Sequence, residues 1–262
     1  MKKILNIFGR RAEGTAPTYF SRRDSGVRPF DPATGYILKA KDLDNIHNAA
    51  AFGNVEKVRK LLLHGKAGVN DLDEKCRTPL HLACAHGFPN VVALLVEKKC
   101  KLNLLDNKGQ TPLIKAVECQ QEDCAAILLE RGADTLHWDT YHNTALHYAA
   151  CGHNIKIATK LLRHNVVMKA RNKEGLTPLL LAVIENDRDM VDLFLKHGAN
   201  VNTSDSFGRT PLMIAASCEP RGVISLLLKY DIDISRKDKN GKKAEDFAID
   251  TLHVLNYLET ET

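Results

Sequence analysis

Long apolar runs are missing from this chain of 262 residues, although 44% of its residues are hydrophobic. A membrane-spanning helix needs about 20 mostly apolar residues, so the sequence predicts no such helix. The apolar stretch near the start, Ile4–Phe8, is also too short for a secretory signal. We therefore expect a soluble protein without a cleaved leader.

Paired cysteines are lacking as well. The seven cysteines are odd in number, and none of them form a Cys-x-x-Cys pair. Disulfide frameworks and zinc ribbons both need paired cysteines, so neither is expected. We expect reduced thiols, buried in helices of a cytosolic or nuclear protein, at Cys84, Cys119, Cys124, Cys151 and Cys218.

Signatures of catalysis are also absent from the sequence. It has no Gly-rich phosphate loop, no Gly-x-Ser-x-Gly elbow and no Cys/His nucleophile arrangement. Four histidines are close enough in sequence to suggest zinc: His137, His142, His147 and His153. The alternative is structural, because His147 shares a repeated position with His81 and His47, where a turn needs hydrogen bonds. We favour the structural interpretation and expect no enzyme activity, no metal and no cofactor.

What the chain does contain is a six-residue sequence motif, called the phrase below, that recurs every 33 residues without drift. Its first full copy is Thr78-Pro79-Leu80-His81-Leu82-Ala83. The later copies begin at Thr111, Thr144, Thr177 and Thr210. Self-similarity at a constant period of this length predicts stacked supersecondary units.

Each unit shows the residues of two helices and a turn. Thr177 before Pro178 is typical of a helix start, because proline suits the first helical position. A second helix is predicted over 190–195, and Lys196-His197-Gly198 is typical of its end. Turn-forming residues then lead to the next threonine.

The period and the Thr-Pro-Leu-His-x-Ala phrase resemble the ankyrin repeat. The resemblance implies an all-α solenoid in which each unit is a helix-turn-helix followed by a β-hairpin finger. We expect a leader over 1–42 and an ankyrin-repeat domain over 43–262, with five well-formed repeats between degenerate capping repeats. The units are 44–77, 78–110, 111–143, 144–176, 177–209 and 210–242, with a carboxyl-terminal cap over 243–262.

The predicted fingers carry an aspartate and a glycine. Asn172 replaces the aspartate once, and Cys76 and His142 replace the glycine. In the fourth finger, the pair Glu174-Gly175 is interpreted as displaced by one position. The regular aspartates are Asp73, Asp106, Asp139, Asp205 and Asp238.

Within the ankyrin family, several segments are similar to the POTE ankyrin proteins and their coiled-coil-bearing relatives. These segments are Asp42–Ala50, Leu82–Gly87, Leu113–Gln120 and Ala158–Leu162, together with the basic Met-Lys-Lys start. The resemblance implies a scaffold role at the inner plasma membrane or the centrosome, with long coiled coils after the repeats. No heptads precede Thr262, so this chain is expected to be an excerpt or a short relative.

The leader is basic. Residues 1–42 hold nine Lys or Arg against four acids, an excess that equals the net charge of the whole chain, +5. The repeats are therefore neutral overall, which argues against nucleic acid as a partner. Weak binding to an anionic membrane, a frayed terminus and a mitochondrial presequence all remain open for the first residues. The membrane candidates are Lys2, Lys3, Ile4, Leu5, Ile7, Phe8, Arg10 and Arg11.

The fingertips are the predicted partner-binding surface, since packing does not require their side chains. Exposed apolar groups ringed by basic groups resemble the centre of a protein interface. The alternative for Trp138 is packing over the neighbouring finger. The partner-binding candidates are Leu72, Lys75, Arg77, His86, Leu105, Lys108, Trp138, Tyr141, Phe207 and Arg209.

Three finger asparagines are candidates for β-hydroxylation because family members are modified at this position: Asn70, Asn103 and Asn202. The alternative is an unmodified asparagine that forms a turn.

Taken together, the sequence predicts a non-enzymatic cytoplasmic scaffold that binds another protein through its concave face. A membrane- or centriole-targeting unit, in which the leader sets location and the repeats act as a spacer, is the alternative. No small-molecule substrate is expected.

Overall fold

The computed structural model describes residues 30–31, 36–37, 45–217 and 222–247. The chain divides into two compact units, residues 1–44 and 45–262. In the first unit, β1 (Phe30–Asp31) pairs antiparallel with β2 (Tyr36–Ile37), and Phe30 lies opposite Ile37. The membrane candidates of the leader lie outside the described residues.

The second unit is built from helix pairs. Its inner helices are α1 (Ile46–Ala51), α3 (Pro79–His86), α5 (Pro112–Glu118), α7 (Ala145–Cys151), α9 (Pro178–Ile184) and α11 (Pro211–Ala216). Its outer helices are α2 (Val55–Leu63), α4 (Pro89–Glu97), α6 (Glu122–Glu130), α8 (Ile155–Leu162), α10 (Arg188–Lys196) and α12 (Gly222–Leu227). Each helix packs on the next of its own row, and the 3₁₀ helix η2 (Ala244–Phe247) packs on α11. The predicted helical solenoid is confirmed.

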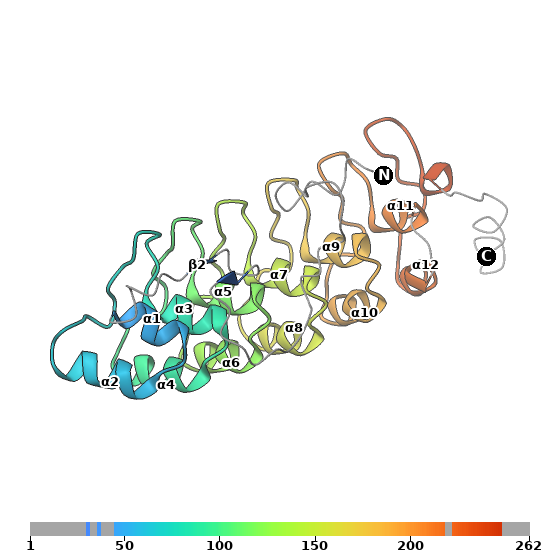
Figure 1. The fold of residues 1–262 in the computed structure, drawn as a ribbon. Coiled ribbons are helices and arrows are strands. Elements are labelled where there is room, and N and C mark those ends of the chain that lie inside the picture. Colours follow the sequence, from blue (N-terminus) through green and yellow to red (C-terminus); the bar gives the residue numbers. More distant parts are fainter. Residues whose placement is uncertain (1–29, 32–35, 38–44, 218–221, 248–262) are drawn as a thin grey trace. The chain divides into compact units, whose positions relative to one another are not determined.

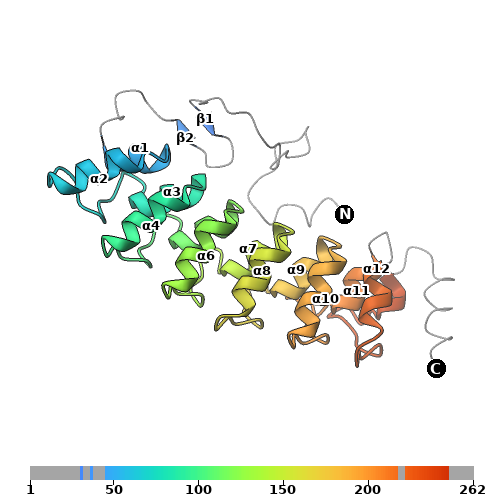
Figure 2. The same ribbon diagram turned by 90° about the horizontal axis from the view of Figure 1, so that it is seen from below.

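The inner row of helices lies next to the loops between units, and the outer row lies away from them. In Figure 1 the inner helices lie next to a series of long loops that stand side by side, and the outer helices lie on the far side. Figure 2 shows the same helix pairs following one another in chain order. The loops are the fingers, and we number them 1 to 6: residues 72–77, 105–110, 138–143, 171–176, 204–209 and 237–242.

The threonine of each phrase caps its helix where the sequence predicts it. The Thr177 side chain accepts the backbone N–H of Leu180, and Pro178 occupies the first turn. The same bond forms at Thr78, Thr111 and Thr210. The outer helices use other caps, since the side chains of Asn54, Asn154 and Asp187 accept from α2, α8 and α10.

In three of the units, a histidine at the same repeat position contacts the end of the finger that follows. The Nδ1 of His147 accepts the backbone N–H of Thr144 at 3.1 Å, and its Nε2 lies 3.1 Å from the carbonyl of Leu176. His81 makes the same two contacts with Thr78 and Gln110. His47 reaches the carbonyl of Arg77. These contacts support the structural interpretation of the histidines.

The core lies between the two rows. The alanine of each phrase is buried, which lets neighbouring inner helices approach closely, as the sequence suggests: Ala83, Ala116, Ala149, Ala182 and Ala215. Among the described residues, the largest fully buried side chain is that of Phe194 in α10.

Two expectations about the fingers need correction. The fingers were expected to be β-hairpins, but they are tight loops. In the described part of the second unit no β-strand forms, and only Trp138 and Thr144 make an isolated antiparallel bridge. Gly175 is in register rather than displaced, because its N–H donates to the carbonyl of Asn172 as that of Gly109 does to Asp106. Its φ of +77° also matches the +69° of Gly109, and the non-glycine residues Cys76 and His142 adopt the same left-handed conformation.

Candidate interaction surface

Each finger is closed by the side chain of its first acidic or amide residue. In finger 3, the Oδ1 of Asp139 accepts the backbone N–H groups of Tyr141 and Asn143 at 2.8 and 2.9 Å. Its Oδ2 accepts the hydroxyl of Tyr148 on α7 at 2.5 Å. Asn172 closes finger 4 with the same Oδ1 pattern, which explains why the amide can replace the carboxylate there. The tips are thus fixed by buried polar groups.

This closure gives a testable consequence for stability. We expect Asp139→Ala to lower the free energy of unfolding by about 2 kcal/mol, because it leaves the buried N–H of Asn143 and the Tyr148 hydroxyl without their acceptor. Asp139→Asn keeps Oδ1 and is expected to cost less than half as much. Urea denaturation followed by circular dichroism measures both, and equal losses would contradict the assigned role.

Neighbouring fingers are joined through their backbones. The carbonyl of Lys75 accepts the N–H of Asn107, and Lys108, Tyr141 and Phe207 accept in the same way from the finger that follows each. Asparagines add a second link, because the Oδ1 of Asn103 accepts the N–H of Asp134 at 3.0 Å. Asn70 and Asn202 bond to Lys101 and Asp233 in the same manner. Hydroxylation of these asparagines stays a prediction, and intact-mass measurement would detect the added oxygen.

Between fingers 4 and 5, the connection is different. The guanidinium of Arg171 donates to the carbonyls of Gly175 and Ser204. Between the helices of the same two units, His153 lies 2.8 Å from Asp187, the residue that caps α10. Side chains thus bind these two units together.

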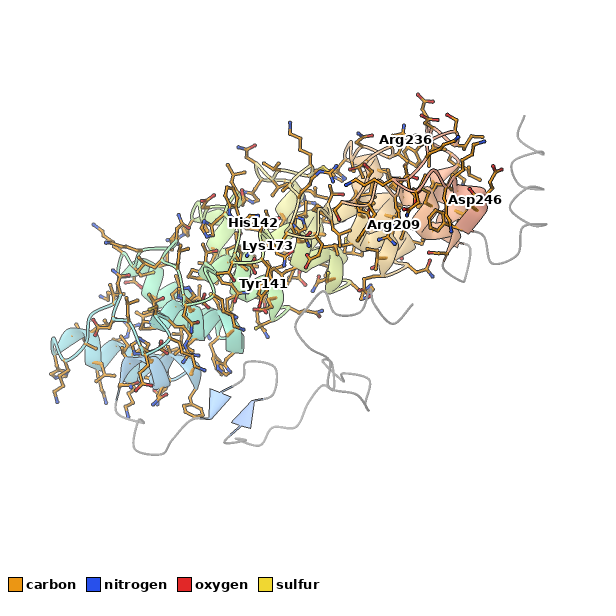
Figure 3. All side chains as sticks on the ribbon, turned by 90° about the horizontal axis from the view of Figure 1, so that it is seen from above. Tyr141, His142, Lys173, Arg209, Arg236 and Asp246 are labelled. Atoms are coloured by element: carbon orange, nitrogen blue, oxygen red, sulfur yellow. The ribbon has the colours of Figure 1, made fainter. Side chains whose placement is uncertain are left out.

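The candidate apolar residues are exposed at the tips. Trp138 is 58% exposed and Tyr141 is 51% exposed, and Leu72, Leu105 and Phe207 are exposed as well. Lys75 and Lys108 are also exposed. Figure 3 shows Tyr141 and His142 together near the middle of the finger row, with Arg209 and Arg236 nearer its carboxyl-terminal end.

The sequence missed the aromatic neighbours of Trp138. The His137 ring stacks beside the indole, with centroids 6.5 Å apart, and the His142 ring approaches it edge-on at 6.1 Å. His137 is itself held by the carbonyl of Gly109 at 3.1 Å. Its adjacency to the sole tryptophan was the available signal. Finger 3 therefore presents a broad aromatic face.

Three candidates have different surroundings from those expected. The Nε of Arg77 donates to Asp73 at 2.6 Å, and the Nε of Arg209 donates to Asp205 at 2.8 Å. Each guanidinium therefore braces its own finger, whereas the sequence suggested that it would pair with acidic groups of a partner. Arg209 also lies over the ring of Phe207, 5.2 Å from its centroid. His86 is the last residue of α3 and is half-buried.

The cysteines differ in burial, whereas the sequence predicted buried thiols throughout the repeat helices. Cys84, Cys100 and Cys124 are buried, but Cys119 and Cys151 are half-buried and Cys76 is exposed. Cys218 lies outside the described residues. Burial raises the pKa of Cys100 to about 11 and that of Cys124 to about 12, so these thiols stay protonated at neutral pH.

The suggested zinc ligands do not converge. His147 is buried in the core, His137 and His142 flank Trp138, and His153 pairs with Asp187. Across the described residues, no three His, Cys, Asp or Glu side chains group as metal ligands. The same part of the chain holds no helix long and apolar enough to cross a membrane.

Comparison with known proteins agrees with the architecture. The family model described as "Ankyrin repeats (3 copies)" matches residues 46–139 and 146–238. The human ankyrin repeat domain-containing protein 7 is 50% identical over 58 residues, which is 22% of this chain and 23% of that relative. The match thus spans less than a quarter of this curated relative.

Solved structures match over most of the chain. The ankyrin repeat domain of human ASB11 has a TM-score of 0.70 and 30% identity, over 78% of this chain and 90% of that one. The ankyrin repeat domain of Bcl-3, a member of the IkappaB protein family, has a TM-score of 0.74 and 29% identity, over 80% and 97%. Ankyrin repeats are protein–protein interaction modules. The repeated phrase, the helix pairs and the fingers thus agree with the family match, and the chain belongs to the ankyrin-repeat family.

Proposed function

We propose that this chain is a non-enzymatic scaffold that binds a segment of another protein across its fingertips and inner helices. The observation that carries the proposal is the line of exposed apolar side chains on three consecutive fingers: Leu72, Leu105, Trp138 and Tyr141. Such groups cluster at the energetic centres of interfaces, with polar residues around them. Here Lys75 and Lys108 supply the polar rim.

The rigidity of the fingers supports the same proposal. In each finger a side-chain oxygen accepts two backbone N–H groups of the tip, and this side chain is buried in fingers 2 to 6; most tips are also bonded to the next through the backbone. A surface ordered before binding loses little conformational entropy when a partner docks. The aromatic face of finger 3 is ordered in this way.

Finer parts of the proposal rest on the sequence. We infer a leader over residues 1–42 and an interaction domain over 43–262, in a protein of the cytoplasm. The segments similar to the POTE ankyrin proteins favour a scaffold at the inner plasma membrane or the centrosome, with coiled coils in a longer product. The alternative function is targeting by the basic leader, favoured by its nine Lys or Arg.

Alanine substitution of the aromatic pair tests the binding surface. We expect Trp138→Ala combined with Tyr141→Ala to weaken binding of a partner, identified by proximity labelling in cells, by at least about 30-fold, the loss that corresponds to a single interface anchor of about 2 kcal/mol. Isothermal titration with the full chain measures this. Leu63→Ala is the matched control, because Leu63 is 68% exposed but lies at the end of outer helix α2. Unchanged affinity in the aromatic variant would remove the proposed surface.

Deletion of residues 1–40 separates the two functions. Retained partner binding with normal localisation favours the scaffold. Retained partner binding with lost localisation favours targeting by the leader. Fluorescence microscopy measures the localisation.

A further inference from the structure

The fingertips change in character along the row. The residue before the finger acid or amide is apolar in fingers 1 to 3, namely Leu72, Leu105 and Trp138. In fingers 4 to 6 the same position holds Arg171, Ser204 and Lys237. The change is strongest at finger 6, whose tip holds Lys237, Lys239 and Lys242 against a single Asp238. We call finger 6 with these three lysines the cationic finger.

The lysines of the cationic finger are exposed, and the one carboxylate within the finger, that of Asp238, is buried. Asp238 is buried, and its Oδ1 accepts the backbone N–H groups of Asn240 and Lys242, each at 2.8 Å. Within residues 45–217 and 222–247, none of the three lysines forms an ion pair with Asp or Glu, whereas the neighbouring Lys243 pairs with Glu245 at 3.6 Å. The Lys242 ammonium lies 5.8 Å from the centroid of the Phe247 ring.

The cationic finger is held as firmly as the others. Lys239 donates its backbone N–H to the carbonyl of Phe207 at 3.0 Å, which fixes finger 6 to finger 5. Arg236, at its base, donates to the carbonyl of Asn202. The backbone of the finger is therefore held in place, and the three lysine side chains extend from it into solvent.

Spacing relates the cationic finger to the aromatic face of finger 3. Neighbouring inner helices pack about 8–10 Å apart, so each finger lies about 10 Å from the next. An extended chain advances about 3.3 Å per residue, or about three residues per finger. Three finger steps separate finger 3 from finger 6, which corresponds to about nine residues of an extended peptide.

We propose that the partner segment is an extended peptide with two parts, an apolar part that docks on fingers 2 and 3 and a run of Asp or Glu about nine residues away that docks on the cationic finger. The inference rests on the proposed function and gives the chemistry of its partner. Carboxylates fit this tip better than nucleic acid does, because residues 43–262 have no net positive charge and a phosphate backbone needs a broad basic surface.

Synthetic peptides test the inference. We would use three fluorescein-labelled peptides of about 16 residues, enough to span fingers 2 to 6 when extended. All three share one half rich in Trp, Leu and Phe, and the other half is acidic, basic or neutral. With the full chain, we expect the acidic peptide to bind about tenfold more tightly than the neutral one, with the difference lost in about 0.5 M salt.

Charge variants assign the effect to the cationic finger. Lys237→Gln, Lys239→Gln and Lys242→Gln combined are expected to abolish the preference for the acidic peptide and leave the neutral peptide unaffected. The matched control is Lys98→Gln, Lys156→Gln and Lys229→Gln, which removes the same charge from exposed positions on or next to outer helices and should keep the preference.

Several outcomes would overturn the inference. They are a preference that survives in the cationic-finger variant, equal binding of the acidic and basic peptides, and no binding of the acidic peptide up to about 1 mM. Tighter binding of a single-stranded oligonucleotide or of phosphatidylserine vesicles would overturn it in favour of that ligand. If Trp138→Ala with Tyr141→Ala loses all three peptides while the lysine variant changes nothing, the proposed function stands and only the acidic partner fails.

Discussion

Phe194→Ala is expected to lower the free energy of unfolding by about 3–5 kcal/mol. Phe194 is fully buried in α10, which packs against α8, α9 and α12. Truncation removes the ring from the core and leaves a cavity that the neighbouring helices fill only in part. Urea denaturation followed by circular dichroism measures the loss.

The repeat architecture sharpens this experiment. Units contact only their neighbours, so a defect in one unit weakens nearby units more than distant ones. Trp138 is the sole tryptophan and lies in finger 3, two units before α10, so its fluorescence reports on a different unit. We expect the dichroism transition of the variant to precede the fluorescence transition.

Phe207→Ala is the control, because Phe207 has the same side chain but is 60% exposed on finger 5. Its loss should stay within about 0.5 kcal/mol. A loss below about 1 kcal/mol for Phe194→Ala would show that α10 is not part of the continuous core.

Acidification is expected to destabilise the fold through His147, on the order of 3 kcal/mol between pH 6.5 and 4. Burial lowers the pKa of His147 to about 4, from an ordinary value of 6.5, and burial also lowers the pKa of His81. Below pH 6.5 the unfolded chain therefore binds a proton that the folded chain does not. The stability contributed by the neutral ring is complete above pH 6.5 and is lost as the pH falls to 4.

The geometry explains why the ring stays neutral. Nδ1 accepts the N–H of Thr144 while Nε2 donates to the carbonyl of Leu176, so the neutral ring satisfies both partners. A second proton on Nδ1 would face that N–H. Protonation of His147 therefore weakens the contact that joins α7 to the end of finger 4.

The matched variant is His147→Leu, because Leu180 occupies the same position of the next unit. The variant is less stable at pH 7 but should lose about 3 kcal/mol less than the parent on acidification. Urea denaturation at a series of pH values measures how the free energy of unfolding changes with pH, which gives one slope for the parent and one for the variant. Parallel slopes would mean that other groups, chiefly carboxylates, account for the acid sensitivity.

The fold could be predicted from sequence because its determinants are local and repeated. Thr177, Pro178 and Gly198 mark helix boundaries through backbone geometry and hydrogen bonds within a few residues. Copying the unit five times makes each such signal visible against the background. The fourth finger glycine was misplaced by one residue even so, although Gly175 lies two periods after Gly109 and the period alone gives its register.

The candidate site was predicted less completely. Exposure of Trp138 and Tyr141 followed from their position in the repeat. The ion pairs that occupy Arg77 and Arg209 could not be foreseen, because a sequence lists a charge without showing which neighbour it meets. The same holds for the two histidines around Trp138, whose contacts depend on how finger 3 folds back on itself.

The sequence alone determined the number of units, their helical content and the positions that packing leaves unused, since these follow from periodicity and local backbone preference. Only the tertiary structure decided which charged side chains form ion pairs within a finger and which face solvent. Hydrogen bonds and ion pairs depend on distances of a few ångströms between residues, and the repeat period does not encode them. The lysines of finger 6 are an example, because the structure shows that the one carboxylate within that finger, that of Asp238, accepts hydrogen bonds from the backbone.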